Sequence, residues 1–177
     1  MIFETERLYV RHLKKEDLDA LHVLYSDPAI MEFIRPPLTK EETKKIFEEQ
    51  LSQYSLQPQL GRYMIVEKKS DTFVGLFMLR KNEDKEGVEI GYSFRKQDWG
   101  KGYATEIVKK GVEYAFGFPL INMVYALTHQ RNANSKNVLT KCGFIYQHDL
   151  SEDGSWSNLF SVVRDQGALK SASASSF

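Results

Sequence analysis

Two glycines beside a strand-like segment are the residues whose spacing most clearly suggests chemistry in this chain of 177 residues. Gly100 and Gly102 stand between VEIGYSF and a helix-like segment. Glycine removes side chains from the first turn, so backbone N–H groups there can approach a ligand closely. The first N–H groups of a helix lack partners inside it, and the helix dipole adds positive charge. The pattern indicates a phosphate or pyrophosphate site, to which Lys101 can add charge.

Glu89, on the strand-like segment before the glycines, is the leading candidate for a general base. A period of two places Glu89, Gly91 and Ser93 on one face of the strand, and Tyr92 and Phe94 on the other. A carboxylate at such a position can accept a proton through water. The alternative is a surface charge on a half-exposed strand.

Three further side chains are weaker candidates. Glu106, in the first turns of the helix, also suits the helix dipole. His129 ends a later strand-like segment, and a lone histidine is more often structural. Cys142 invites a nucleophile interpretation, but it precedes the helix-ending Gly143, and no histidine or acid is placed to activate it. We therefore expect no covalent intermediate on Cys142.

A second segment, RNANSKNVLTKCGF at residues 131–144, carries Asn132 and Ser135 near the start of a short helix. Capping of that helix is one explanation for both residues. Together the two segments resemble the GNAT superfamily of acyl-CoA-dependent N-acyltransferases, especially the branch of ribosomal-protein N-terminal acetyltransferases. The resemblance runs over roughly residues 3–163, and rests on ETERLYVRHLKKEDLDAL, EIGYSF, WGKGYATE, YAF, Asn132-x-x-Ser135 and Lys141-Cys142-Gly143-Phe144.

The resemblance implies direct transfer of an acetyl group from acetyl-CoA to a primary amine, such as a protein N-terminal α-amine. The alternatives are a non-catalytic acyl-CoA-binding domain and an acetyltransferase of a small-molecule amine such as a polyamine or antibiotic. An unrelated α/β protein that binds a nucleotide through the glycine turn is a further alternative. A small-molecule or peptide amine is therefore the expected partner.

The glycine motif fits the family's pyrophosphate loop in two registers. Gln97-x-x-Gly100-x-Gly102 fits literally, whereas Trp99-x-x-Gly102-x-Ala104 starts the helix close to Gly102 and is preferred. The residues implied to bind the co-substrate are Tyr92, Ser93, Phe94, Gly100, Lys101, Gly102, Tyr103, Ala104, Thr105, Asn132 and Ser135.

Ser135 is also the implied hydrogen-bond donor near the leaving sulfur, and Glu89 is the candidate base that accepts the proton of the amine. Leu139 stands where many GNAT enzymes carry a tyrosine donor, so Ser135 has either an acid role or only a CoA-orienting one. Aromatic residues near Pro36-Pro37, such as Tyr25 and Phe33, are expected in the core or along the acceptor site, which the first-helix region covers in this family.

The composition agrees with a globular enzyme and gives no sign of other partners. The chain is 42% hydrophobic and 27% charged, and its 24 Lys and Arg balance its 24 Asp and Glu, so neither nucleic acid nor an anionic membrane is indicated. No apolar run approaches the ~20 residues of a membrane span, and no signal-peptide pattern opens the chain. One cysteine fits a reducing cytoplasm, and the 4 histidines lack metal-ligand spacing. We expect a cytoplasmic monomer or homodimer without a metal.

Periodicity predicts one α/β domain over residues 1–165, with a mixed, mostly antiparallel sheet of six to seven strands and about four helices. Strands are expected at 7–13, 62–69, 72–81, 87–94, 122–129, 144–150 and 156–163. Helices are expected at 15–26, 40–54, 102–117 and 134–142. Thr39 and Glu42 form a capping-box pattern at the start of the second helix. Residues 166–177 form a small, polar tail that is expected to be disordered or a non-native extension.

Overall fold

The computed structural model describes residues 1–82, 85–152 and 155–165. Eight strands form one sheet in the order β1-β2-β3-β4-β5-β6-β8-β7, and each neighbouring pair is antiparallel except the parallel pair β5 and β6. The strands are β1 (Phe3–Glu4), β2 (Leu8–His12), β3 (Gly61–Glu67), β4 (Thr72–Arg80), β5 (Val88–Phe94), β6 (Met123–His129), β7 (Ile145–Glu152) and β8 (Ser155–Val163). The mixed α/β sheet is as expected. The additional strand is β1, which at 2 residues is too short to leave a periodic pattern.

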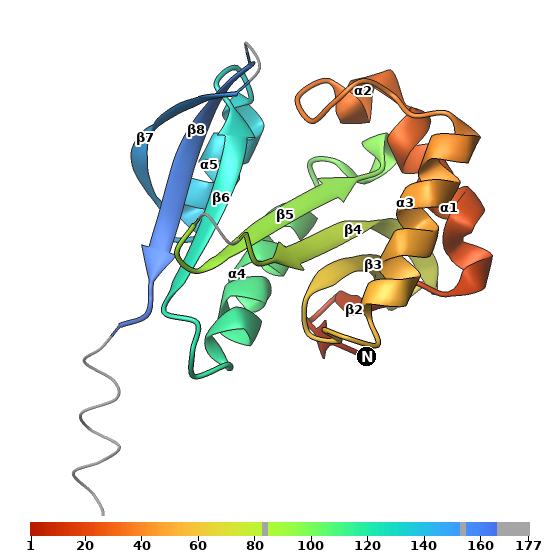
Figure 1. Ribbon diagram of the computed structural model, residues 1–177, viewed down its shortest axis with the longest axis horizontal. Coiled ribbons are helices and arrows are strands. Elements are labelled where there is room, and N and C mark those ends of the chain that lie inside the picture. The colour runs from red at the N-terminus through yellow and green to blue at the C-terminus, as the bar shows by residue number, and fades with distance from the viewer. Residues whose placement is uncertain (83–84, 153–154, 166–177) are drawn as a thin grey trace, which may run out of the picture.

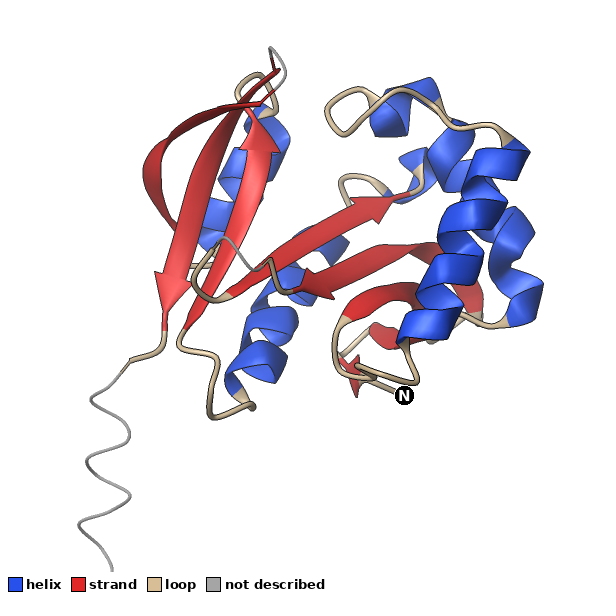
Figure 2. Cartoon of the chain, viewed as in Figure 1, coloured by secondary structure: helices blue, strands red, loops and turns tan. Residues whose placement is uncertain are grey.

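Helices cover both faces of the sheet (Figures 1 and 2). They are α1 (Leu18–Ser26), α2 (Pro28–Met31), α3 (Lys40–Gln53), α4 (Tyr103–Phe116) and α5 (Ala133–Lys141). One core cluster joins the sheet to α1, α2 and α3, and a second joins it to α4 and α5. The sequence patterns missed α2, a single turn that Asp27 caps by accepting the Ala29 N–H at 2.8 Å.

Local sequence signals set the ends of the longer helices. Thr39 and Glu42 make both bonds of the capping box, so α3 begins where the pattern predicts. Gly102 adopts φ +81° immediately before α4, and Gly143 adopts φ +85° just after α5. Positive φ values are inexpensive only for glycine, which explains why the chain turns at these two points.

β5 and β6 pair over a short distance and then diverge. Their parallel register includes only Val88 with Val124 and Glu89 with Tyr125 (Figure 1). Beyond Glu89, the side of β5 that faces β6 is therefore open. This gap lies in the middle of the sheet, between the ends of α2, α4 and α5 (Figure 1).

Some expectations fall outside the described residues. The tail predicted at 166–177 is one of these, and positions 83–84 and 153–154 between predicted strands also lie outside the described residues. Within the described part, no helix is both long and apolar enough to span a membrane.

Candidate active site

A cleft of about 1000 Å³ opens where β5 and β6 diverge. It is lined by β5 from Glu89 onward, the end of β6, the first turns of α4 and α5, and the segment 29–35 around α2. Gly100 and Gly102 of the glycine turn line this one space together with Glu89 and Ser135, whereas Lys101 between the two glycines does not. The structure therefore brings together segments that lie more than 100 positions apart in the sequence.

The glycine turn presents backbone rather than side chains to the cleft. Gly100 has φ +75° and Gly102 has φ +81°. A Cβ built on Gly100 would meet nothing within 4 Å, and one on Gly102 would meet only Arg7 Nη2 at 3.5 Å. Neither glycine is thus required by tight packing inside the protein. Together with the first N–H groups of α4, which by its geometry lack partners within the helix, the turn fits a pyrophosphate.

Lys101 and Tyr103 have side-chain partners of their own. Lys101 Nζ lies 2.8 Å from Asp98 Oδ1, and the hydrogen bond to this buried carboxylate raises the pKa of Lys101. Arg95 Nε holds the other oxygen of Asp98 at 2.8 Å. The buried Tyr103 donates its hydroxyl proton to Glu67. Tyr103 therefore offers the cleft its backbone N–H rather than its side chain.

Glu106 has a structural role that makes it a poor base. Its carboxylate accepts the Thr5 hydroxyl at 2.5 Å, the Arg7 N–H at 2.9 Å and Arg7 Nε at 2.7 Å. Burial raises the pKa of Glu106, but these hydrogen bonds and the charge of Arg7 outweigh it and leave that pKa below its usual value. The group ties the β1–β2 connection to α4.

The open edge of β5 offers backbone groups at alternate residues. The Arg95 N–H donates to Val74 O of the neighbouring segment at 2.9 Å, so by ladder alternation Ser93 also faces β4. The N–H and C=O groups of Tyr92 and Phe94 then point into the gap. Trp99 Nε1 donates to Phe94 O at 2.9 Å, which occupies part of that acceptor.

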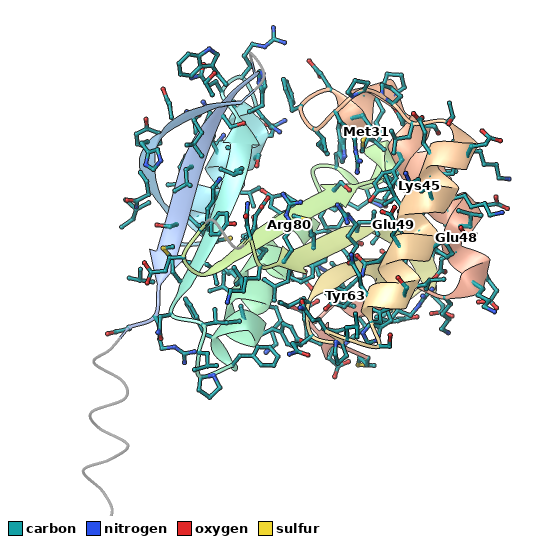
Figure 3. All side chains as sticks on the ribbon, viewed as in Figure 1. Met31, Lys45, Glu48, Glu49, Tyr63 and Arg80 are labelled. Atoms are coloured by element: carbon teal, nitrogen blue, oxygen red, sulfur yellow. The ribbon has the colours of Figure 1, made fainter. Side chains whose placement is uncertain are left out.

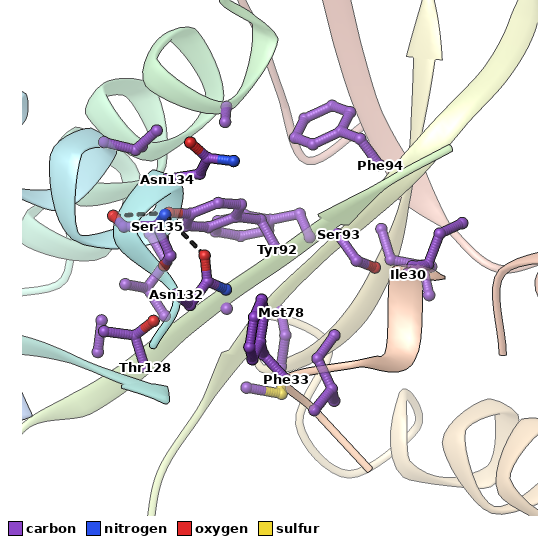
Figure 4. A pocket seen from close by; sticks show the side chains of 18 of the residues that line it. Ile30, Phe33, Met78, Tyr92, Ser93, Phe94, Thr128, Asn132, Asn134 and Ser135 are labelled. Carbon is purple, nitrogen blue, oxygen red and sulfur yellow. Dashed lines mark hydrogen bonds between the residues drawn. The ribbon is translucent and has the colours of Figure 1, made fainter. Parts of the chain in front are cut away.

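Tyr92 and Ser135 form a hydroxyl pair across the cleft floor. Tyr92 Oη and Ser135 Oγ lie 3.2 Å apart (Figure 4). Burial raises the pKa of Tyr92 to about 12, although the hydrogen bond with Ser135 partly opposes this rise. Asn132 Oδ1 accepts the Ser135 N–H at 3.0 Å, which confirms that Asn132 caps α5. The sequence analysis did not identify the Tyr92 hydroxyl as a possible donor, because strand periodicity does not show which residues of α5 lie beside it.

The positions of Leu139 and Cys142 bear on the acid and nucleophile alternatives. Leu139, at the position of the usual tyrosine donor, is fully buried in the core beside α4. Cys142 Sγ donates to Thr105 O at 3.6 Å, and burial raises the pKa of this thiol. A thiol held protonated is a weak nucleophile, so this environment does not favour a nucleophilic role for Cys142.

Glu89 is buried rather than a surface charge, with 6% of its area exposed. Its Oε2 accepts Arg80 Nε at 3.0 Å and lies 2.9 Å from Arg80 Nη2. The two residues are direct cross-strand partners on β4 and β5, and Arg80 lies beside the gap (Figure 3). The sequence did not reveal this pair because the β4–β5 register cannot be read from it.

The segment after α2 reaches across the cleft to the end of β6. The Phe33 ring stacks on the His129 ring with centroids 5.3 Å apart. Phe33 and Met78 of β4 both line the cleft (Figure 4). His129 Nδ1 also accepts the Arg131 N–H at 3.2 Å. His129 thus has a packing and turn-forming role, while Phe33 forms a wall of the cleft. Within the described residues, no group of three His, Cys, Asp or Glu side chains is placed to hold a metal ion.

Comparison with known proteins identifies the family. A family model described as an acetyltransferase (GNAT) domain matches residues 7–145. An uncharacterized N-acetyltransferase p20 of Bacillus licheniformis is 30% identical over 142 residues, 79% of this chain and 80% of that protein. A spermidine N-acetyltransferase of Vibrio cholerae, solved with CoA and spermine, has a TM-score of 0.77 at 18% identity, covering 90% of this chain and 97% of that one. RimL, a ribosomal L7/L12 alpha-N-protein acetyltransferase solved with CoA, has a TM-score of 0.79 at 18% identity, covering 93% and 98%.

The chain therefore belongs to the GNAT acetyltransferase family. Its class of activity is acetyl-CoA-dependent N-acetyl transfer, as the sequence motifs indicated. The two solved structures share the fold at 18% identity and are named for different acceptors, spermidine and a ribosomal protein. The fold alone thus leaves the acceptor amine of this chain open.

Proposed function

We propose that this protein transfers acetyl directly from acetyl-CoA to a primary amine, with a peptide or protein N-terminal α-amine as the leading acceptor. The observation that carries the proposal is the gap between β5 and β6, which begins at Glu89 and exposes the backbone of Tyr92 and Phe94. A pantetheine arm can add to such an edge like an extra strand. The N-terminus of α4, with Gly100 and Gly102, is available to the pyrophosphate.

The two proposed chemical roles lie on opposite faces of β5. The Tyr92 side chain extends toward α5, whereas Glu89 faces the side of α1 and α2. A thioester held between the strands would have a hydroxyl donor on one side and a carboxylate on the other. The amine would then enter past α2 and Phe33.

On the donor side, the Tyr92–Ser135 pair stabilises the departing thiolate with a hydrogen bond. Because burial raises the pKa of Tyr92 to about 12, the phenol stays protonated at neutral pH. A thiol has a pKa of about 8.5, so full proton transfer from Tyr92 is unnecessary. This assigns to Tyr92 the donor role that Leu139 cannot fill, with Ser135 orienting the phenol.

On the amine side, Glu89 takes the proton through water while Arg80 holds the carboxylate in place. An α-amine has a pKa of about 7.7–8.0, and a lysine amine one of about 10.4, so the α-amine needs less help at neutral pH. The test is an acetyl-CoA thiol-release assay over N-terminal peptides, lysine side-chain amines, polyamines and aminoglycosides, with products identified by mass spectrometry. CoA binding without acetylation of any amine would favour a non-catalytic acyl-CoA-binding domain instead.

A further inference from the structure

The acceptor side of the cleft carries two arginines that have no anionic partner. Arg35 and Arg62 both line it, and among the described residues neither forms an ion pair. Arg35 Nε is moreover buried without a hydrogen-bond partner in that part of the chain. Buried polar groups are normally satisfied, and charged ones are costly to leave unpaired. An unpaired buried donor in a binding cleft indicates that a ligand supplies the missing acceptor.

Arg35 and Arg62 are held in place before any ligand arrives. The Arg35 guanidinium carbon lies over the Tyr25 ring at 4.9 Å, and the residue precedes Pro36-Pro37, which stiffen the backbone. The Arg62 N–H donates to Gln50 Oε1 at 3.0 Å, and Arg62 O accepts the Tyr54 hydroxyl. Gln50 lies on α3 and Tyr54 directly follows this helix, so both contacts fix the Arg62 backbone, while the described residues form no ion pair with its guanidinium.

Among the described residues, two of the three carboxylates that line the cleft form ion pairs with cationic side chains. Glu89 is paired with Arg80, and Asp98 is paired with both Arg95 and Lys101. Glu32, which is exposed, is the other acidic residue that lines the cleft. A polycationic acceptor needs several free carboxylates, and here it would instead meet Arg35 and Arg62.

We propose that the acceptor is an amine that also carries a carboxylate, bound by Arg35 and Arg62 while Glu89 faces the amine. This inference rests on the proposed acetyl transfer and specifies its substrate class. Arginine suits the role because its planar fork can donate two hydrogen bonds to one carboxylate. The acceptor is thus an acidic N-terminal peptide or a free amino acid rather than a polyamine or aminoglycoside.

The test uses peptide amides Ala-Glu-Ala-Ala, Ala-Gln-Ala-Ala and Ala-Lys-Ala-Ala, with L-alanine, L-alaninamide and spermidine as further acceptors. We expect kcat/KM for the Glu peptide to exceed that for the Gln peptide by about tenfold, the size of one charge-assisted hydrogen bond, with the Lys peptide and spermidine lowest. A similar preference for L-alanine over L-alaninamide would identify free amino acids as the source of the carboxylate. The proposal is overturned if the Lys peptide or spermidine is preferred, or if the three peptides react equally.

Arg35→Gln and Arg62→Gln should each reduce the preference for the acidic acceptor while CoA binding is unchanged. Arg131→Gln is the matched control, because Arg131 is exposed and does not line the cleft. Calorimetric binding of the Glu peptide to the CoA-saturated protein provides a readout that does not need turnover. If no amine is acetylated, the proposed function fails, yet tighter binding of the Glu peptide that Arg35→Gln weakens still supports the carboxylate site. Equal binding of the Glu and Gln peptides would refute that site.

Discussion

The hydroxyl oxygens of Tyr92 on β5 and Ser135 on α5 lie 3.2 Å apart, so one hydrogen bond links the strand and the helix at the floor of the cleft. In the proposed function, Tyr92 takes the donor role that many GNAT enzymes give to a tyrosine at the position of Leu139. This relationship gives the first prediction.

Tyr92→Phe should lower kcat by about tenfold or more, because one hydrogen bond to a charged leaving group is lost. CoA affinity should stay within a few fold, since the backbone of residue 92 is kept. Ser135→Ala should also lower kcat, and the double variant should lose less than the product of the two losses, because the pair acts as a unit. Since the pKa of Tyr92 is about 12, no kinetic titration between pH 6 and 9 should arise from it. A Tyr92→Phe enzyme with full kcat would exclude the donor role.

Glu89→Gln should lower turnover more than it weakens CoA binding. The substitution removes a proton acceptor but keeps the volume and a polar contact to Arg80. The loss should shrink as pH rises from 6 to 9, because an α-amine with a pKa of about 7.7–8.0 is increasingly neutral there. The measurement is kcat and KM against pH. Glu48→Gln, on the exposed surface of α3, is the control, and a pH-independent ratio between wild type and Glu89→Gln would exclude the base role.

Gly102→Val should weaken CoA binding by about a hundredfold or more, because a β-branched side chain obstructs the backbone cradle where about two charge-assisted hydrogen bonds form. Gly143→Val is the matched control: Gly143 has a similar φ of +85°, and a Cβ there meets nothing within 4 Å, whereas one on Gly102 meets only Arg7 Nη2 at 3.5 Å. Both variants should lose similar stability, but only Gly102→Val should lose CoA affinity. Normal CoA binding by folded Gly102→Val would refute the cradle.

Cys142→Ala should retain acetyl transfer within a few fold, because burial raises the pKa of the thiol and the thiol donates to Thr105 O. Mass spectrometry of the enzyme mixed with acetyl-CoA alone should detect no acetylated Cys142. An inactive variant that still binds CoA would instead support an acyl-enzyme route.

The sequence by itself determined the features that depend on neighbouring residues. Gly102 marked the start of α4, and Thr39 marked the start of α3, because left-handed turns and caps are encoded within a few positions. The period of two placed Glu89 and Tyr92 on opposite faces of β5. The family motifs likewise indicated acetyl-CoA as the co-substrate, because each motif is a short run of neighbouring residues.

Only the tertiary structure decided which distant side chains meet. The pairing of Glu89 with Arg80 depends on strand register, and that of Tyr92 with Ser135 depends on how α5 packs beside β5. The unpaired state of Arg35 likewise depends on every segment that surrounds the cleft. These contacts are non-local, so they leave no periodic trace along the chain. The sequence thus determined the class of reaction, whereas the arrangement of charges in the acceptor cleft was decided by the packing of the sheet against its helices.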